Sequence, residues 1–380
     1  MMGVGIWRDE QQPVVVEAEF SVPDAVLASY GLDNAHIELL TGGRTNRTMR
    51  VRAGRDLVLQ QMFGTGHNDL LGVMENLVRV TSHLEWRRAV EQLGDSWYPI
   101  LVPANTGKPF IMTEAGDVWR AFSYRPGQIL RSEQPLSTLA SAAAIYGRFA
   151  AQTSDLGGPL LIETAPGFHN LDSIYSAFGS AVDDADSAAQ ELMAEDTRLI
   201  AGLKRRVDDR CAADGVVWSP DRVVHNDTKL SNVLFDRDHG RAVAVLDLDL
   251  VMVGPLWHDF GDLIRSSAWH APEASLGHEP KCTPELFDAV VGAFVEAAGD
   301  TVSDAEIVTF PIAGARLSLE LGVRYLHDHL RAEPHLRVSG PKGHLVRGRA
   351  NLKLAHEMLS AYDALRLIAD RCIAGRRETK

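Results

Sequence analysis

The densest group of polar side chains in the sequence lies between short apolar runs. The eight residues 225–232 read HNDTKLSN, with two valines before them and the apolar residues 233–235 after them. A second apolar run, 242–246, ends at Asp247. Polar groups beside buried strands cost free energy unless they are paired or coordinated. The cluster therefore indicates a site with a chemical task.

Phosphoryl transfer is a task that fits these residue types. It needs a carboxylate that orients and deprotonates the attacking hydroxyl, a cation near the γ-phosphate, and oxygen ligands for Mg²⁺. We predict that Asp227 is the catalytic base and that Lys229 contacts the γ-phosphate. Asn232 and Asp247 offer the hard oxygen atoms that Mg²⁺ prefers, and they are the predicted metal ligands. The implied cofactors are ATP and Mg²⁺.

The spacing of these residues is more specific than their types. The pattern His-x-Asp-x-Lys-x-x-Asn, followed fifteen residues later by an aspartate at the end of an apolar strand, has the form of a kinase catalytic loop and its metal-binding aspartate. His225 is expected to support this loop by hydrogen bonding. The alternative is a polar hairpin loop whose Asp and Asn only cap turns. Four correctly spaced residues and the second element favour the catalytic interpretation.

The rest of the pattern predicts the elements that hold this segment. Short alternating runs with glycine turns over 36–62 predict an antiparallel meander, and helical spacing over 70–93 predicts a helix after it. Two further runs, 109–113 and 118–124, are expected to close the sheet. Beyond residue 126 the chain is predicted to be mostly helical, over 136–152, 173–181, 188–212, 284–298, 307–330 and 352–369.

These elements predict an α+β fold with two lobes, of the kind that eukaryotic protein kinases have. The small N-terminal lobe, residues 1–121, contains the antiparallel sheet and covers the nucleotide. Residues 122–127 form the hinge. The C-terminal lobe, residues 128–380, is large and mainly helical, and it carries the catalytic and substrate-binding residues.

Composition and charge limit the possible partners. The 380 residues are 45% hydrophobic and 23% charged, which is typical of a soluble globular protein. There are 38 Lys and Arg against 51 Asp and Glu, and the net charge of −13 would repel a polyphosphate backbone. Nucleic acid is therefore not expected as a partner. A small anionic substrate is not excluded, because local groups and not the total charge decide what a site binds.

The sequence carries no sign of a membrane segment or of a disulfide framework. No apolar run approaches the ~20 residues that a membrane span needs, and residues 1–13 lack the apolar stretch of a signal peptide. Cys211, Cys282 and Cys372 lie far apart and are predicted to be free thiols. We predict a cytoplasmic protein without a membrane partner, either a monomer or a homodimer.

The sequence resembles the superfamily of aminoglycoside phosphotransferases and choline kinases, to which the stretch 225–232 is specific. Within it, the chain looks most like the N-acetylhexosamine 1-kinases, over about residues 25–370. The matching segments are LVLQQM at 57–62, VMENLVRVTSHL at 73–84, HNDTKLSNVLF at 225–235, residues 246–249, DFGDLIR at 259–265 and residues 345–358. The resemblance implies transfer of a phosphoryl group from ATP to the anomeric hydroxyl of a hexosamine or related hexose.

The expected nucleotide contacts depart from the common superfamily pattern. Kinases of this superfamily usually carry Lys or Arg on the third strand, whereas this chain has Gln60 and Gln61, as the sugar 1-kinase branch does. Glu75 stands where a kinase pairs a helix Glu with that Lys; an ordinary exposed Glu is the alternative. The adenine is expected beside the hinge, with Phe122 as a wall and Tyr124 nearby, although Tyr124, like Trp119, could equally serve in hinge packing.

The resemblance also implies positions that bind the sugar substrate, together with Asp227. Arg324 matches an arginine that binds sugar in those kinases; the alternative is a ladder of surface ion pairs, since charged residues recur every four positions from 316 to 328. Arg44 stands where the branch has His, and His335 stands where it has Tyr. These two changes predict an altered sugar preference and not a loss of chemistry.

Other functions remain open from the sequence. A kinase of the same fold with a cyclitol, amino alcohol or aminoglycoside acceptor is the nearest alternative, although Arg44, Arg324 and His335 disfavour a polycation. A protein kinase fits less well, because only twelve residues separate Asp247 from Asp259 and leave no room for a long activation segment. A catalytically silent nucleotide-binding module and a metallohydrolase are the remaining alternatives.

Overall fold

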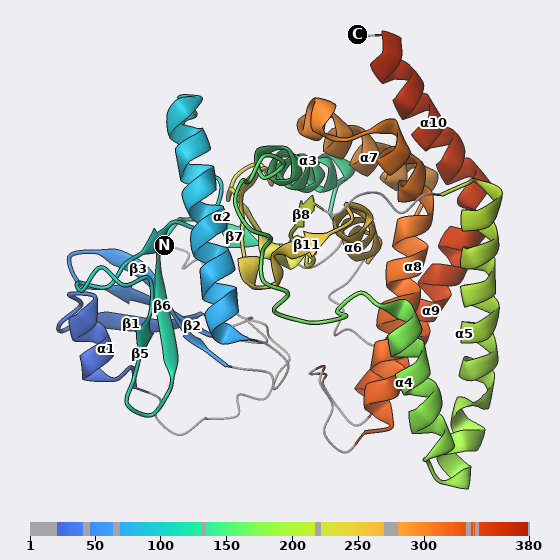
Figure 1. Ribbon diagram of the computed structural model, residues 1–380, viewed down its shortest axis with the longest axis horizontal. Coiled ribbons are helices and arrows are strands. Elements are labelled where there is room, and N and C mark those ends of the chain that lie inside the picture. Colours follow the sequence, from blue (N-terminus) through green and yellow to red (C-terminus); the bar gives the residue numbers. More distant parts are fainter. Residues whose placement is uncertain are drawn as a thin grey trace, which may run out of the picture.

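The computed structural model describes residues 21–40, 46–63, 69–130, 134–216, 222–269, 280–331, 336, 338 and 342–378. A sheet-rich part and a larger helical part lie side by side, with one long helix, α2 (Leu70–Val90), standing between them (Figure 1). The arrangement confirms the predicted α+β fold of the kinase-like type, with a small antiparallel sheet and a large helical region.

The first sheet is antiparallel, with strand order β1-β2-β3-β6-β4 and β5 paired to β6. Its strands are β1 (His36–Leu40), β2 (Arg47–Arg52), β3 (Asp56–Met62), β4 (Leu101–Val102), β5 (Ile111–Met112) and β6 (Val118–Ser123). Alternation in β2 and β3 sends Met49, Val51, Leu57 and Leu59 to one face, where α1 (Asp24–Ser29) covers them. The predicted meander and its closing strand at 118–124 are present.

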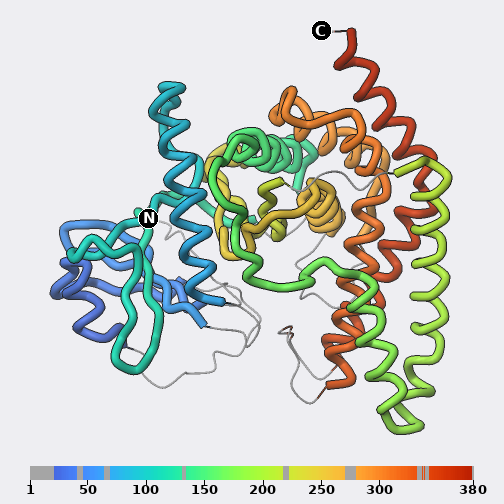
Figure 2. Tube along the Cα trace, viewed as in Figure 1, coloured from blue at the N-terminus to red at the C-terminus, as the bar shows by residue number. Residues whose placement is uncertain are grey.

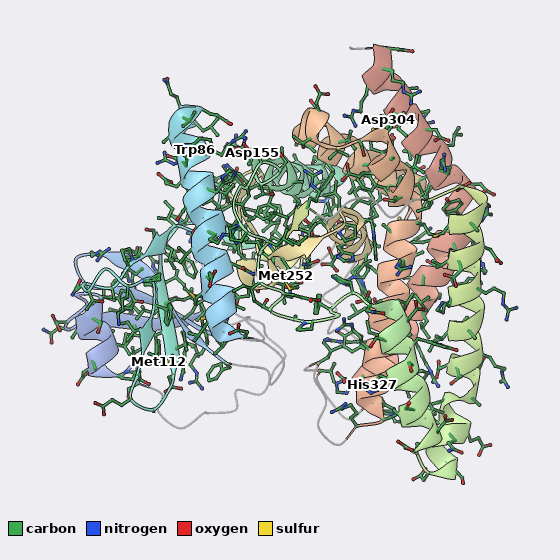
Figure 3. The ribbon with its side chains drawn as sticks, viewed as in Figure 1. Trp86, Met112, Asp155, Met252, Asp304 and His327 are labelled. Carbon is green, nitrogen blue, oxygen red and sulfur yellow. The ribbon has the colours of Figure 1, made fainter. Side chains whose placement is uncertain are left out.

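Helix α2 covers the other face of the sheet and also packs on the helical part. Asp69 caps its start by accepting a hydrogen bond from the amide of Leu71. Its apolar face, which includes Leu77 and Val80, belongs to a core that continues into the helical region. At the far end, Asp155 binds Arg87 at 2.8 Å and His83 at 3.1 Å (Figure 3). Helix α2 is therefore held to the part of the chain that follows the first sheet.

The chain leaves the first sheet after Ser123 and enters a small second sheet at Gln128, so the predicted hinge 122–127 spans this connection. The division into lobes at these boundaries stays a prediction. Figure 2 follows the trace from here into the helices. The remaining elements are β7 (Gln128–Ile129), α3 (Leu136–Gln152), α4 (Leu171–Asp183), α5 (Ser187–Ala213), β8 (Arg222–Val224), η1 (Leu230–Asn232), β9 (Val233–Phe235), β10 (Ala242–Val245), η2 (Leu248–Leu250), β11 (Met252–Gly254), α6 (Trp257–Ser267), α7 (Pro284–Ala298), η3 (Gly299–Thr301), α8 (Asp304–His329), α9 (Gly343–Ser360) and α10 (Tyr362–Glu378).

Two short sheets and helix α6 form the platform of the predicted catalytic segment. Strands β10, β9 and β7 pair in that order, and β11 pairs with β8. Helix α6 packs closely on α8: the Phe260 and Phe310 rings stack at 4.0 Å, and a Cβ at Gly261 would lie 2.8 Å from the carbonyl oxygen of Ala313. Glycine is needed there because any side chain would push the two helices apart.

The predicted helices are present, with one difference. The helix predicted over 352–369 is two helices, α9 and α10, separated at Ala361. The hydroxyl of Tyr362 hydrogen-bonds Asp214, so the first residue of α10 is tied to the end of α5. This contact joins residues far apart in the sequence, so the local periodicity does not predict the break between the two helices. Among the described residues, none of the helices has the length and apolar character needed to cross a membrane.

Candidate active site

His225 fixes the catalytic segment to the strand that precedes Asp247. Its Nδ1 accepts a hydrogen bond from the amide of Asp227 at 3.3 Å, so its Nε2 donates to the carbonyl oxygen of Leu246 at 2.9 Å. Tyr146 and Phe149 of α3 meet the imidazole edge to face, at 5.4 and 5.6 Å. The histidine thus supports the loop by hydrogen bonding, as its sequence position predicts.

Asp259 of α6 holds the loop from below. Its carboxylate accepts the amides of His225 at 2.9 Å and Asn226 at 2.7 Å, and its carbonyl oxygen accepts the Thr228 hydroxyl at 2.6 Å. Burial raises the pKa of Asp259 above its usual range, while His225 and these amide bonds oppose the shift. Asn226 is in the left-handed region, with φ of 62°, a strained conformation for a residue with a side chain. The Asp259 bonds hold this turn in place.

Asp227 forms a hydrogen-bonded group with two of the other predicted residues. Its Oδ2 lies 2.6 Å from the Lys229 ammonium and 2.8 Å from the Asn232 amide nitrogen. Burial alone would raise the pKa of Asp227, but the charge and hydrogen bond of Lys229 outweigh it and hold that pKa below its usual range. Burial would lower the pKa of Lys229, but Asp227 and Asp247 hold it above normal. Asp227 is therefore ionised at neutral pH, as a base must be.

Asp247 lies beside this group at the start of η2. The amide of Leu246 donates to the carbonyl oxygen of Asn232 at 2.8 Å, which ties the two segments together. Asp247 itself has φ 58° and ψ 65°, so its backbone makes a sharp left-handed turn after the strand. Desolvation by the surrounding protein, followed by the negative charges of Asp249 and Asp227, raises the pKa of Asp247 to about 6. Solvent still reaches the side chain.

The donor set fits a divalent cation that is shared with a bound phosphate. Within the described part of the chain, no three His, Cys, Asp or Glu side chains are arranged to hold a metal ion alone. Asp247 and the amide oxygen of Asn232 offer hard oxygen ligands, and Mg²⁺ usually takes one or two such ligands together with phosphates and water. A cation here would also offset the repulsion among Asp227, Asp247 and Asp249 that raises the pKa of Asp247.

The two glutamines of β3 are both engaged within the first sheet. Gln60 donates to Thr48 at 3.0 Å and accepts from Arg120 at 2.9 Å, whereas Gln61 accepts from Arg47 at 2.8 Å. They point to opposite faces of the strand, as neighbours in a strand must. Gln60 thus lies next to the site through Arg120, while its role as a direct nucleotide ligand stays a prediction.

The contacts of Glu75 and of the two hinge aromatics, Phe122 and Tyr124, do not by themselves indicate that they bind the nucleotide. Glu75 is exposed on α2, and no hydrogen bond or ion pair of the described residues involves it, which favours the exposed-Glu interpretation. Its neighbour Asn76 is buried and bonds to both Ile162 and Val251, at 2.8 and 3.1 Å. Phe122 is part of the large core. Tyr124 stacks under the Arg50 guanidinium, 3.6 Å from its ring centre.

Among the positions predicted for the sugar, Arg324 is described, whereas Arg44 and His335 lie outside the described residues. Arg324 binds the Glu320 carboxylate at 3.2 Å and lies 4.7 Å from the centre of the Phe168 ring. Glu320 is only 2% exposed, so the surface-ladder interpretation is wrong for this pair. His169 shares the same carboxylate oxygen, at 2.9 Å.

Several residues of the site were not found by sequence reasoning. Arg120 and Asn46 both bind Asp249, and His169 and Glu320 form a buried pair beside Arg324. Arg120 did leave a signal, because it is a charged residue in the otherwise apolar strand VWRAF. The His169–Glu320 contact joins residues 151 positions apart, so no local pattern points to it.

The His258 imidazole is half-buried and lies between the Arg324 cluster and the catalytic loop. It contacts His169 at 4.3 Å between ring centres and donates to Asn226. Burial, and then the charges of His169 and Arg316, lower its pKa from 6.5 to about 2. Below about pH 6.5, His258 therefore binds a proton in the unfolded chain but stays neutral in the folded protein. Stability is full above that pH and decreases as the pH falls toward 2.

We expect this histidine to make acid unfolding steeper. Between pH 7 and pH 5, His258 alone should lower the free energy of unfolding by about 2 kcal/mol. The variant His258→Gln, which keeps a donor toward Asn226, should lack this loss. Urea unfolding of both proteins at the two pH values measures the difference. An equal decrease in the free energy of unfolding of the wild type and the variant would contradict this role of His258.

Comparison with known proteins places the fold and the site in a class. Residues 36–301 match the model of the phosphotransferase enzyme family, APH. The structure of spectinomycin phosphotransferase in complex with ADP and spectinomycin is 12% identical with a TM-score of 0.59, over 90% of this chain and 97% of that chain. Amicoumacin kinase in complex with AMP-PNP, Ca²⁺ and Ami is 13% identical, with a TM-score of 0.58 over 88% of this chain and 92% of that chain. Plasmodium vivax ethanolamine kinase is 11% identical, with a TM-score of 0.56 over 89% and 88%.

The fold and the site define a small-molecule phosphotransferase of the kinase-like type. The family match covers well over half of the chain, and the structural neighbours share its architecture at low identity. The chain belongs to the phosphotransferase enzyme family, APH. The predicted membership of a phosphotransferase family is thereby confirmed, whereas the relation to the N-acetylhexosamine 1-kinase branch stays a prediction.

Proposed function

We propose that this protein transfers the γ-phosphoryl group of ATP to the anomeric hydroxyl of a small sugar, giving a sugar 1-phosphate and ADP. The observation that carries the proposal is the Asp227 carboxylate, held ionised by Lys229 and Asn232 on a loop beside Asp247. Structural neighbours that hold ADP or AMP-PNP support a nucleotide as the phosphoryl donor.

In this proposal Asp227 binds and orients the acceptor hydroxyl and takes up its proton as the oxygen attacks. An anomeric hydroxyl is more acidic than an ordinary alcohol, so a carboxylate with a low pKa is a sufficient base. Lys229 balances the charge of Asp227 and, in this proposal, contacts the oxygens of the transferred phosphoryl group. Asp247 and Asn232 would hold Mg²⁺, which neutralises phosphate charge when it is bound.

The surroundings of Arg324 support a sugar as the acceptor. Arg324 and His169 share the buried Glu320 carboxylate, whose other oxygen has no hydrogen-bond partner among the described residues. His169 Nε2 is likewise buried without such a partner. Polar groups of this kind, next to the Phe168 ring, suit a molecule with hydroxyls on one edge and an apolar face. The N-acetylhexosamine 1-kinase resemblance favours a hexosamine among such molecules.

A screen for acceptor-dependent ADP release tests the proposal. The panel contains hexoses, N-acetylhexosamines, cyclitols, amino alcohols and aminoglycosides, each with MgATP. Asp227→Asn is the inactive control for contaminating ATPases. We expect the largest stimulation with a hexosamine or hexose, and NMR of the product should place phosphate on C1. Stimulation only by amino alcohols or aminoglycosides would overturn the sugar assignment and keep the reaction class.

Arg324 should control the affinity for the sugar and not that for ATP. We expect Arg324→Met to raise the KM for the sugar about tenfold, since a hydrogen bond from a charged group contributes about 1.5–3 kcal/mol. The KM for ATP should change less than about twofold, because Arg324 lies in the His169–Glu320 cluster and not at Asp247. Steady-state kinetics with each substrate varied checks both values, and Arg324→Lys should recover part of the affinity. A variant with an unchanged KM for the sugar would contradict the assignment.

A further inference from the structure

Arg120 occupies the position across the sheet from the missing phosphate-binding lysine. Strands β3 and β6 are antiparallel neighbours, and Gln60 is paired with Arg120 in their register. Directly paired residues on adjacent strands point to the same face. A long cation on β6 therefore reaches the space that a lysine on β3 at position 60 would reach. The Arg120 Nε donates to the Gln60 amide oxygen at 2.9 Å, which directs the guanidinium along this face.

The guanidinium of Arg120 is buried and retains unused donors. The residue is 1% exposed, and its NH2 group binds Asp249 at 2.6 Å. Within the described part of the chain, its NH1 group hydrogen-bonds only to the sulfur of Met74, at 3.9 Å, and a thioether is a weak acceptor. A guanidinium has five N–H donors, and a buried cation is costly unless its charge is well paired. Arg120 therefore keeps weakly satisfied donors, which a phosphate oxygen brought to this face of the sheet would satisfy.

Asp249 holds Arg120 in place from the opposite lobe. One of its carboxylate oxygens accepts Arg120, and the other accepts the side-chain amide of Asn46 at 2.8 Å. Both oxygens are thus engaged by the first sheet and by Asn46, so the contacts of Asp249 are those of an anchor. Among the ion pairs of the described residues, Arg120–Asp249 is the one that joins the first sheet to the segment after Asp247.

The usual partner of a phosphate-binding lysine is absent here. In protein kinases a Glu on the helix after strand 3 pairs with that lysine and orients it. Here the helix residue Glu75 is exposed and has no described partner, whereas the Asp249 carboxylate holds the cation. The Arg120–Asp249 pair, from β6 and the segment after Asp247, thus takes the place of the usual pair between a strand-3 lysine and a helix glutamate.

We propose that Arg120, oriented by Asp249, binds the α- and β-phosphates of the nucleotide in place of the strand-3 lysine. This inference rests on the proposed use of ATP as the phosphoryl donor. It makes Arg120 a phosphate ligand and Asp249 a positioning residue. A merely structural bridge between the lobes would stabilise the fold without distinguishing ligands that differ in their phosphates.

Calorimetric binding of adenosine and of MgADP separates these two roles. We expect Arg120→Met to weaken MgADP binding at least about tenfold and to change adenosine binding less than twofold, because adenosine carries no phosphate. Asp249→Asn, which keeps the side-chain shape, should weaken MgADP binding by a smaller factor. Arg120→Lys should recover part of it. Arg52→Met removes an exposed cation from the same sheet and should change neither affinity.

The possible results separate the phosphate role of Arg120 from the proposed use of ATP. Equal loss of adenosine and MgADP affinity in Arg120→Met, or an unchanged MgADP affinity, would overturn the inference while ATP use stands. If Arg120→Met does not fold, the same comparison of MgADP affinity with adenosine affinity is made on Asp249→Asn, and its result decides. Wild-type protein that binds adenosine and MgADP equally well would overturn the phosphate role, and wild-type protein that binds neither would overturn the proposed use of ATP as well.

Discussion

Replacing Asp227 with Asn should lower kcat at least about a thousandfold, within the range that a general base contributes. The amide has the size of the carboxylate and can still accept from Lys229, so the loop should keep its shape. It cannot take up the proton of the acceptor hydroxyl. The affinity for MgATP should remain within about twofold, because a shape-conserving change at the base leaves the metal and phosphate ligands in place.

Steady-state kinetics and nucleotide calorimetry on the purified variant measure this effect. Asp238→Asn, which neutralises an exposed acid in the turn between β9 and β10, is the matched control and should keep full activity. Retention of more than about a tenth of the wild-type rate would refute the role of Asp227 as base, since general acid–base catalysis contributes about a hundredfold or more.

Asp247→Asn should have the second largest effect on activity, because it removes a charged ligand of the predicted metal ion. A bound cation supplies several kcal/mol of charge stabilisation, so losing a charged ligand should lower kcat/KM by about two to three orders of magnitude. The Mg²⁺ concentration for half-maximal activity should rise as well. Unlike Asp227→Asn, this variant should bind MgADP more weakly than wild type, because Asp247 connects the cation to the protein.

Titration of Mg²⁺ at fixed ATP, with and without the substitution, measures this effect. Thermal unfolding with MgADP is the second readout, because a ligand stabilises a fold in proportion to its affinity. Asp247→Glu keeps the charge and should recover part of the Mg²⁺ dependence. An unchanged Mg²⁺ requirement in Asp247→Asn would show that the cation is held elsewhere.

The catalytic segment could be predicted from the sequence because its information is local. Residues 225–232 form one loop, and Asp247 follows a short strand, β10, that pairs with β9, the strand before it in the chain. The helix predicted over 284–298 is α7 with the same bounds, where Thr283 caps a start with proline in the first turn. Caps, periodicity and turn residues act over a few positions, and the sequence displays them directly.

The roles of Arg120 and Glu75 could not be read in the same way. The contact between Arg120 and Asp249 joins residues 129 positions apart and depends on the register of β3 against β6. Glu75 has the sequence position of a kinase ion-pair partner, but the face of α2 that Asn76 anchors to Ile162 turns it to solvent. Helix rotation is a tertiary property, decided by packing on both lobes.

The surroundings of Arg324 show the same limit. Arg324 was found by resemblance alone, whereas His169 and Glu320 meet it only because α8 packs beside the segment that leads into α4. The spacing of charges over 316–328 predicts a solvent-exposed row equally well. The burial of Glu320 separates the two interpretations, and burial is not written in the local pattern.

The most direct test of the account is ³¹P NMR of a reaction that contains the protein, MgATP and the best acceptor of the screen. The account predicts a new sugar 1-phosphate resonance that grows in step with ADP, and no such resonance with Asp227→Asn. Release of the γ-phosphate as inorganic phosphate, or equal product formation by the variant, would contradict it.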